Sequence, residues 1–208
     1  MMKFLARIWL DYLKPFWSKI RWNKQRKVVA EECKETVKTI AEIRAVCSKV
    51  YSCFEWTMDD ITQLFDSYRP TEYLYNTYLG EKAEGKKWQD DCDGYHTVIY
   101  HILTQNGFDA VLFTIATKPF TKSHTMCLFK ADGKMYLVDY TSVREYESGN
   151  IQAIVDDYNK RNKLEPEHYW NTQKYDYAGK VFYSVNFEEN DHEQKGLETT
   201  SFGGDNAE

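Results

Sequence analysis

The stretch SHTMCLFKADGKMYLVDY (residues 123–140) decides the fold. Two runs rich in apolar residues, 123–130 and 134–140, flank the dipeptide Asp132-Gly133. Asp-Gly between two such runs is a strong signal for a two-residue hairpin turn, because both turn positions must adopt a positive φ. The stretch therefore predicts two adjacent antiparallel strands.

The turn also determines which side chains share a face of the hairpin. With a two-residue loop, Met126 lies opposite Asp139, and His124 is the diagonal neighbour of Asp139 on the same face. The apolar residues of that face predict that a helix covers it: Met126, Leu128, Met135 and Leu137. An isolated His and Asp would be costly to bury there, so we expect a His124–Asp139 hydrogen bond that holds the imidazole in one tautomer. Cys127 has the opposite parity, and we expect no chemical role for it.

A cysteine between two aspartates begins a predicted helix in KKWQDDCDGYHTVIYHIL (residues 86–103). Asp91 is the expected N-cap, which places the Cys92 thiol in the first turn, where the helix dipole stabilises a thiolate. Asp91 and Asp93 oppose that thiolate by like-charge repulsion, so a nearby cation is needed, ideally a protonated histidine. Taken alone, Cys92 suits packing as well as chemistry. Gly94 is expected to leave space beside the thiol for an acyl substrate.

A helix that packs on the hairpin face would bring its first residue to the His–Asp pair. Cys92 would then be the nucleophile, His124 the base and Asp139 the orienting carboxylate, as in a catalytic triad. The backbone N–H of Cys92 and one side-chain donor would form the oxyanion hole. The candidate donors are Trp88 and Gln89.

These motifs carry a resemblance to a known family. The order Cys, His, Asp in DCDGY, SHTMCLF and LVDYT resembles the transglutaminase-like superfamily, and among its members the bacterial transglutaminase-like cysteine peptidases. The resemblance covers residues 86–141 and implies an α+β, papain-like core, in which the helix carrying the Cys packs on an antiparallel sheet. It also implies the triad roles of Cys92, His124 and Asp139, and a thiol hydrolase or acyltransferase acting on a peptide or protein amide.

Two alternatives stay open beside this interpretation. DCDGY is also similar to the DCSGF of NlpC-type cell-wall peptidases, although these usually place the His further downstream. The other alternative is a non-catalytic transglutaminase-like interaction module whose basic N-terminal helix binds a membrane or a protein partner.

No metal or cofactor is expected. Cys92 and His96 share a helix face, but His101 lies about 140° further round, so the helix offers no zinc ligand set. We expect His96 and His101 to be surface or packing residues of the helix. No glycine loop that could cradle a phosphate occurs.

The chain is expected to have four parts. These are a basic amphipathic helix that Pro15 kinks (1–28), a helical region (29–85), the catalytic core (86–187) and an acidic disordered tail (188–208). The individual elements expected in the middle two parts are helices at 29–54, 57–68, 92–106 and 150–162, a polar loop at 80–87, and further strands at 108–117 and 180–187. Cys33 and Cys47 lie on the apolar stripe of the first of these helices and are expected in the core.

The charge distribution argues against a nucleic-acid-binding protein, and the cysteine content argues against a disulfide framework. Residues 1–28 hold eight of the 27 Lys and Arg residues and one of the 32 acidic residues, so the remainder carries 19 basic against 31 acidic residues. A body this acidic is a poor nucleic-acid surface. Five cysteines without a CxxC pattern favour a cytoplasmic or other reducing compartment. No signal peptide and no membrane-spanning run are recognised, and the basic helix leaves peripheral membrane association as a hypothesis.

Overall fold

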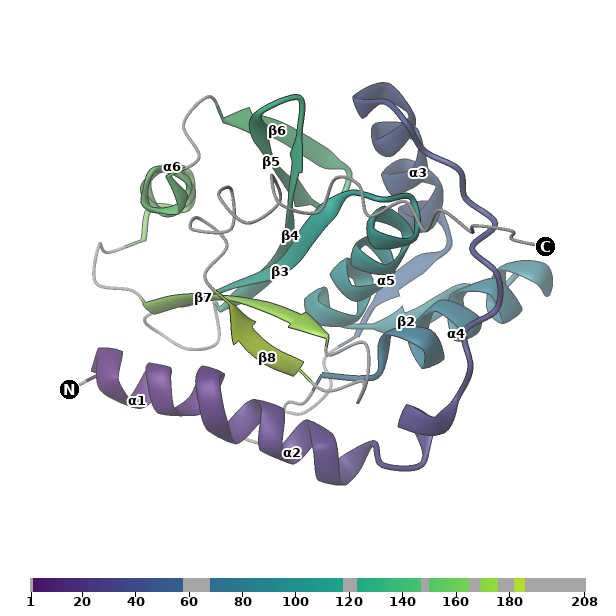
Figure 1. Cartoon of the computed structure of the whole chain (residues 1–208), viewed down its shortest axis with the longest axis horizontal. Helices are drawn as coiled ribbons and strands as arrows, with labels where there is room; N and C mark the ends of the chain where they lie inside the picture. The colour runs from purple at the N-terminus through teal and green to yellow at the C-terminus, as the bar shows by residue number, and fades with distance from the viewer. Residues whose placement is uncertain are drawn as a thin grey trace, which may run out of the picture.

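The central element is a six-stranded antiparallel sheet in the order β6-β5-β4-β3-β7-β8 (Figure 1). The computed structural model describes residues 2–57, 68–117, 123–146, 150–164, 169–175 and 182–185. The strands are β3 (Asp109–Ala116), β4 (His124–Ala131), β5 (Lys134–Asp139), β6 (Ser142–Tyr146), β7 (Tyr169–Tyr175) and β8 (Phe182–Val185). A second, parallel sheet joins β1 (Phe54–Trp56) to β2 (Trp88–Asp90). The α+β class with an antiparallel sheet is thus confirmed.

The hairpin has the predicted register. Ala131 pairs with Lys134, and the ladder continues to Cys127 opposite Val138. Asp132 and Gly133 both have a positive φ, of 52° and 71°, as a two-residue turn between twisted strands requires. The turn residues therefore set the pairing that places His124 and Asp139 at the same end of the sheet.

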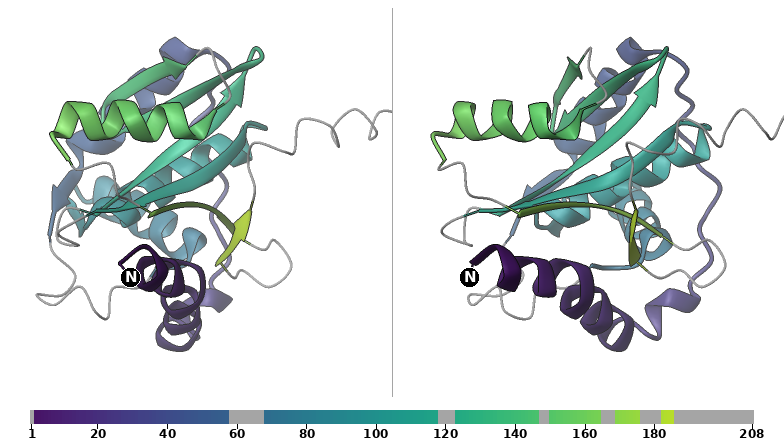
Figure 2. Two further views of the ribbon diagram at one scale, coloured as in Figure 1. Left: turned by 90° about the vertical axis from the view of Figure 1, so that its left-hand side faces the viewer. Right: turned by 60° about the vertical axis from the view of Figure 1, so that its left-hand side comes forward.

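Helices cover both faces of the sheet (Figure 2). The face that carries Met126 and Leu128 packs against α6 (Ile151–Asn162). The opposite face, with Cys127 and Phe129, packs against α5 (Cys92–Gln105). The prediction that the Cys92 helix covers the Met126 face was therefore wrong. Alternate residues of β4 and β5 are apolar on both faces of the sheet, because helices bury it on two sides. The pattern of apolar residues therefore does not show which face α5 covers.

The predicted helix at 29–54 was wrong in its first part. α3 spans only Ile40–Ser52, and Thr39 and Glu42 form a capping box at its start. The segment before Thr39 has no regular structure and hydrogen-bonds to α4 (Thr71–Ala83), for example from Lys34 N–H to the Tyr75 hydroxyl at 2.9 Å. Of the apolar residues at helical spacing in this segment, Val37 is buried in the core and Cys33 packs against it, whereas Val29 is exposed.

Other predictions had mixed outcomes. α5 and α6 match the expected helices, and β3 and β8 lie within the expected strands. α4 was not predicted, and it continues through the first half of the expected loop at 80–87. β1, β2, β6 and β7 were also missed. Most of the predicted 57–68 helix and the whole 188–208 tail lie outside the described residues.

The N-terminal helix runs past β7 as one rod with a π-helical turn at its centre (Figure 1). It comprises α1 (Met2–Ile8), the π turn η1 (Trp9–Leu13) and α2 (Lys14–Arg21). Pro15 sits in the first turn of α2 and has no backbone N–H to donate. The wider π turn before it accommodates this missing hydrogen bond, so the helix continues past Pro15. Within the described parts of the chain, no helix is long and apolar enough to cross a bilayer.

Candidate active site

Cys92 is the first residue of α5, as predicted from its sequence context. Asp91 is the N-cap, with an extended backbone, and its carboxylate accepts a hydrogen bond from Asp93 N–H at 2.9 Å. Cys92 as a residue is partly exposed. It therefore sits in the first turn, at the positive end of a 14-residue helix.

His124 and Asp139 form the predicted hydrogen bond, with His124 Nε2 at 2.9 Å from Asp139 Oδ1. The two side chains are 15% and 22% exposed, so solvent reaches both. Burial acts against the charged carboxylate of Asp139, but the hydrogen bond and charge of His124 outweigh it and hold the pKa of Asp139 below its usual value. An ionised Asp139 requires the proton on His124 Nε2, which leaves the Nδ1 lone pair as the basic atom.

His96 ties the Cys92 end of α5 to the residue that follows Asp139. Its Nε2 accepts a hydrogen bond from Tyr140 N–H at 3.0 Å, so its proton is on Nδ1, which donates to the Cys92 carbonyl oxygen at 2.7 Å. The His96 and His124 rings lie 5.6 Å apart, centroid to centroid. The sequence suggested only a surface or packing residue, whereas this fully buried imidazole joins the helix start to the sheet end.

Two tyrosines flank the same space. The rings of Tyr140 and Tyr158 lie 5.6 and 6.1 Å from the His124 ring. The pKa of each tyrosine is raised mainly by burial, and the charges of Cys92 and Asp139 raise it further. Both tyrosines therefore lie within electrostatic range of the thiol and of the carboxylate, on either side of the imidazole.

Two cations pair with Asp93 and Asp90, two of the acids near Cys92, and neither pairing was predicted from the sequence. Lys14 Nζ of the N-terminal helix lies 2.9 Å from Asp93 Oδ2, with both side chains buried. Arg69 lies 2.8 Å from Asp90, whose carboxylate is fully buried. The charge opposing a thiolate is thus reduced by Lys14 and Arg69 as well as by any histidine.

Gly94 does not leave open space beside the thiol, as the sequence had suggested. A Cβ at this position would lie well under 3.0 Å from the Asp90 carboxylate atoms. The glycine is needed because the buried Asp90 side chain packs directly against the helix backbone.

The oxyanion candidates lie on β2 and have different environments. Gln89 donates its side-chain amide to Glu55 of β1 at 3.0 Å, so it is engaged away from the thiol. Trp88 is buried against Phe54, and its indole N–H has no hydrogen-bond partner within the described part of the chain. The Trp88 indole N–H is therefore an unused donor among the described residues, whereas Gln89 has given one of its two amide hydrogens to Glu55.

Among the described residues, one group has metal-ligand spacing, and it consists of Asp90, Asp91 and Asp93. Asp90 already pairs with Arg69 and Asp93 with Lys14, and the Asp91 carboxylate accepts the Asp93 N–H, so the group is engaged within the protein. His101, the other helix histidine, is buried and packs on the Tyr75 ring at 4.4 Å. It lies outside the Cys92 site and fills the core.

No protein-family model and no curated protein matches this chain. The site must therefore be judged from its own geometry. A cavity of about 450 Å³ borders it at Tyr140 and is lined by Tyr51, Ser52, Phe54, Trp56, Lys87 and Tyr140. A larger hollow lies at the hairpin-turn end of the sheet, where no member of the Cys–His–Asp set is found.

The buried histidines predict a specific pH dependence of stability. Burial lowers the pKa of His96 from 6.5 to about 3, and the neighbouring His124 charge adds to this. Between these values the unfolded chain binds a proton that the folded one excludes, so the free energy of unfolding falls with falling pH, by up to about 1.4 kcal/mol per unit. His101, with a pKa lowered to about 4 by burial, adds a second contribution.

We expect His96→Gln to reduce this slope by roughly 1 kcal/mol per pH unit between pH 6 and 5, measured by urea unfolding. The lowered pKa of Asp139 contributes only below its ordinary value of 3.8, outside this window. His101→Gln is the matched control. It should reduce the pH slope of the free energy of unfolding by a similar amount while leaving the Cys92 site intact. An unchanged slope in His96→Gln would show that His96 titrates normally in the folded protein.

Proposed function

We propose that the protein is a thiol-dependent hydrolase or acyltransferase of papain-like, transglutaminase-like type, acting on peptide or protein amides. The observation that carries this proposal is the His124–Asp139 hydrogen bond beside the N-terminus of α5, where Cys92 is the first residue. A thiol, an oriented imidazole and a carboxylate are the groups that acyl transfer through a thioester requires.

In the proposed reaction, His124 Nδ1 takes the proton of Cys92, and the thiolate attacks the carbonyl carbon of the amide. The resulting imidazolium is stabilised by ionised Asp139 and then gives its proton to the leaving amine, which breaks the C–N bond. Water or a second amine, deprotonated by His124, then attacks the thioester and releases the acyl group and the free thiol. The first-turn backbone N–H groups, and Trp88 as side-chain donor, would stabilise the oxyanion.

The cavity beside Tyr140 supports a substrate with an apolar or aromatic side chain. Its volume of about 450 Å³ lies in the range of small-molecule and side-chain pockets. Tyr51 and Trp56 are about half exposed within it and offer aromatic faces for such a group. Lys87 at the same cavity adds a cation for a nearby carboxylate of the substrate.

The test is thiol labelling by iodoacetamide at pH 7, read at each cysteine by peptide mass spectrometry. Cys53, also partly accessible, is an internal reference in the same molecule. We expect Cys92 to react at least about tenfold faster than Cys53, and His124→Ala to remove this advantage, because the thiolate loses its imidazolium partner. Asp139→Asn should give an intermediate rate.

Hydrolysis of a peptide-amide library completes the test, with Cys92→Ala as the inactive reference. If Cys92 reacts no faster than Cys53, or if His124→Ala leaves its rate unchanged while circular dichroism shows a folded protein, the proposed triad does not operate. A non-catalytic interaction module would then be the better interpretation.

A further inference from the structure

The N-terminal helix has its apolar side chains on the outside. Its buried stripe recurs every four residues and holds only one large apolar residue, Leu10, beside Ala6, Lys14 and Ser18. The outer side carries seven large apolar residues that are 40–65% exposed: Phe4, Leu5, Tyr12, Leu13, Phe16, Trp17 and Ile20. In a helix that only packs on its own domain, the apolar stripe faces the core. This reversed pattern indicates a second surface that the outer face meets.

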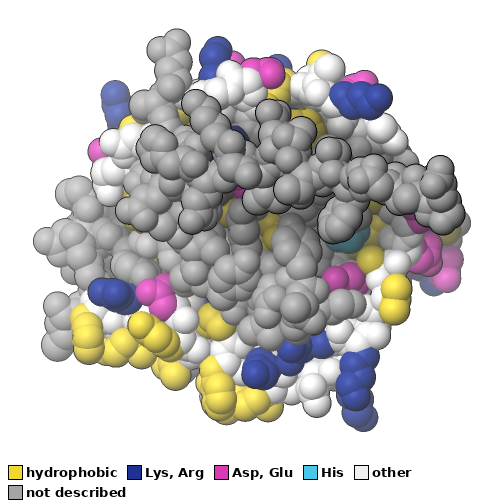
Figure 3. All heavy atoms as spheres, in the orientation of Figure 1, with side chains coloured by type: hydrophobic (Ala, Val, Ile, Leu, Met, Phe, Trp, Pro, Cys, Tyr) yellow, Lys and Arg dark blue, Asp and Glu magenta, His cyan; other side chains and the backbone are white. Residues whose placement is uncertain are grey.

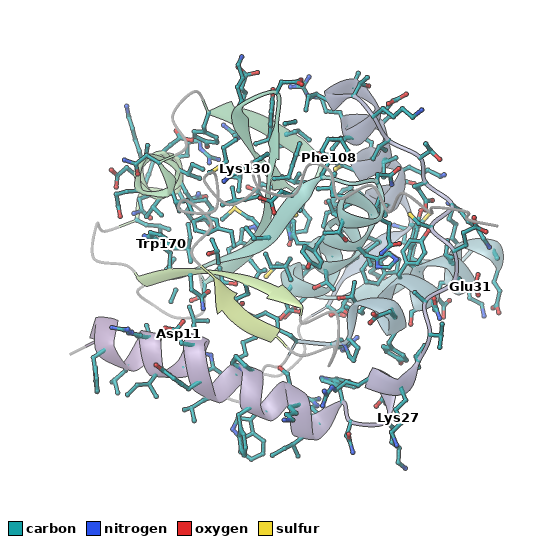
Figure 4. All side chains as sticks on the ribbon, in the orientation of Figure 1. Asp11, Lys27, Glu31, Phe108, Lys130 and Trp170 are labelled. Atoms are coloured by element: carbon teal, nitrogen blue, oxygen red, sulfur yellow. The ribbon has the colours of Figure 1, made fainter. Side chains whose placement is uncertain are left out.

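Polar bonds hold the inner side of the helix to the body. Lys14 pairs with Asp93, and the Ser18 hydroxyl accepts the Tyr68 N–H at 2.8 Å. Asn171 of β7 donates to Asp11 at 2.9 Å, and Asp11 lies on the side of the helix that faces β7 (Figure 4). The outer apolar face is therefore presented with the helix already anchored, and no unfolding is needed to expose it.

The charge around this face selects its partner. Basic residues in the last turn of the helix and in the segment just after it are exposed: Lys19, Arg21, Lys24 and Lys27. Figure 3 shows apolar side chains along the edge where this helix lies, with Lys and Arg beside them. A second copy of the chain would bring these four exposed basic residues against the same four residues of its partner, which like-charge repulsion disfavours. An anionic surface complements them.

We propose that this outer face, from Phe4 to Lys27, docks in the plane of an anionic membrane surface. Its apolar side chains would enter the boundary between headgroups and acyl chains while the basic residues contact lipid phosphates. The helix lies along one side of the molecule (Figure 1), and the acidic body would stay away from the lipid. This inference does not depend on the chemistry proposed for Cys92.

The test is vesicle flotation of the full chain, with phosphatidylcholine vesicles and with vesicles that also contain phosphatidylglycerol. We expect binding to the anionic vesicles at least about tenfold stronger than to the neutral ones, and weaker at high salt. Phe16→Ser/Ile20→Ser should abolish binding. Val29→Ser is the matched control, because Val29 is 79% exposed outside this face.

The charge contribution is tested by Lys19→Glu/Lys24→Glu, which should weaken binding to anionic vesicles about tenfold or more. Lys38→Glu, an exposed lysine outside the face, should leave binding unchanged. Equal binding to both vesicle types, or binding that Phe16→Ser/Ile20→Ser leaves intact, would overturn the proposal. So would an absence of vesicle binding, or a dimer in sedimentation that the same double variant dissociates, since a second copy would then cover the face.

Discussion

Replacing Lys14 by methionine is expected to destabilise the protein by roughly 3–5 kcal/mol. The Lys14 and Asp93 side chains are 4% and 2% exposed, and their charged atoms lie 2.9 Å apart. Methionine fills similar volume but leaves the Asp93 carboxylate buried without its cation, and the cost of an unpaired buried charge greatly exceeds the net value of the pair. The cation–π contact of Lys14 with the Tyr68 ring, at 4.0 Å, is lost as well.

Urea unfolding of four proteins measures this effect as a double-mutant cycle. Lys14→Met and Asp93→Asn should each be strongly destabilising, whereas the combined variant should recover a large part of the loss, because no unpaired charge remains. Lys19→Met, an exposed lysine on the same helix, should change stability by about 0.5 kcal/mol or less. If the effects of Lys14→Met and Asp93→Asn simply add, the two residues are not coupled in solution.

The Lys14–Asp93 pair also joins the N-terminal helix to the first turn of α5. Lys14 belongs to the helix proposed to meet a membrane, and Asp93 follows Cys92 directly in the chain. Losing the Lys14 charge should therefore also slow iodoacetamide labelling of Cys92, because Asp93 would then repel the thiolate. Labelling of Cys53 in the same variant provides the reference.

Local signals predicted the hairpin and the start of α5 correctly. The backbone conformation of Asp132-Gly133 fixes the register of the hairpin. The Asp91 carboxylate caps α5 by accepting a hydrogen bond from the N–H of Asp93, only two residues away. These interactions span few residues, so the sequence displays both partners together. The His124–Asp139 bond then follows from the register and from the cost of burying either group alone.

The failures share a different cause, which is dependence on distant residues. Glu35 lies in the non-helical first part of the predicted helix at 29–54, where it accepts hydrogen bonds from the Tyr75 and Tyr78 hydroxyls, about forty residues away. Lys14 reaches Asp93 across 79 residues. Helical spacing of apolar residues cannot reveal such partners. One local signal was overlooked, since Thr39 and Glu42 at capping-box spacing mark the true start of α3.

Gly94→Ala is the second change with a large expected effect, roughly 3 kcal/mol of destabilisation or more. The added methyl group would overlap the Asp90 carboxylate, which cannot easily move. Arg69 holds it at 2.8 Å, and the Asp90 carbonyl accepts Thr57 N–H at 2.8 Å. Either the first turn of α5 shifts, which moves Cys92, or the buried Asp90–Arg69 pair breaks. Both outcomes are costly.

Gly80→Ala separates this clash from the general effect of alanine in a helix. Gly80 lies in α4 with nothing within 4 Å of an added Cβ, so alanine there should stabilise the protein by about 0.5–1 kcal/mol. The two changes in the free energy of unfolding, measured by urea unfolding, should have opposite signs. The loss at Gly94 is then a local clash and not the general effect of alanine in a helix. An Asp90→Ala background should then remove most of the cost of Gly94→Ala. If the cost persists in that background, another contact near the Cys92 turn requires the glycine.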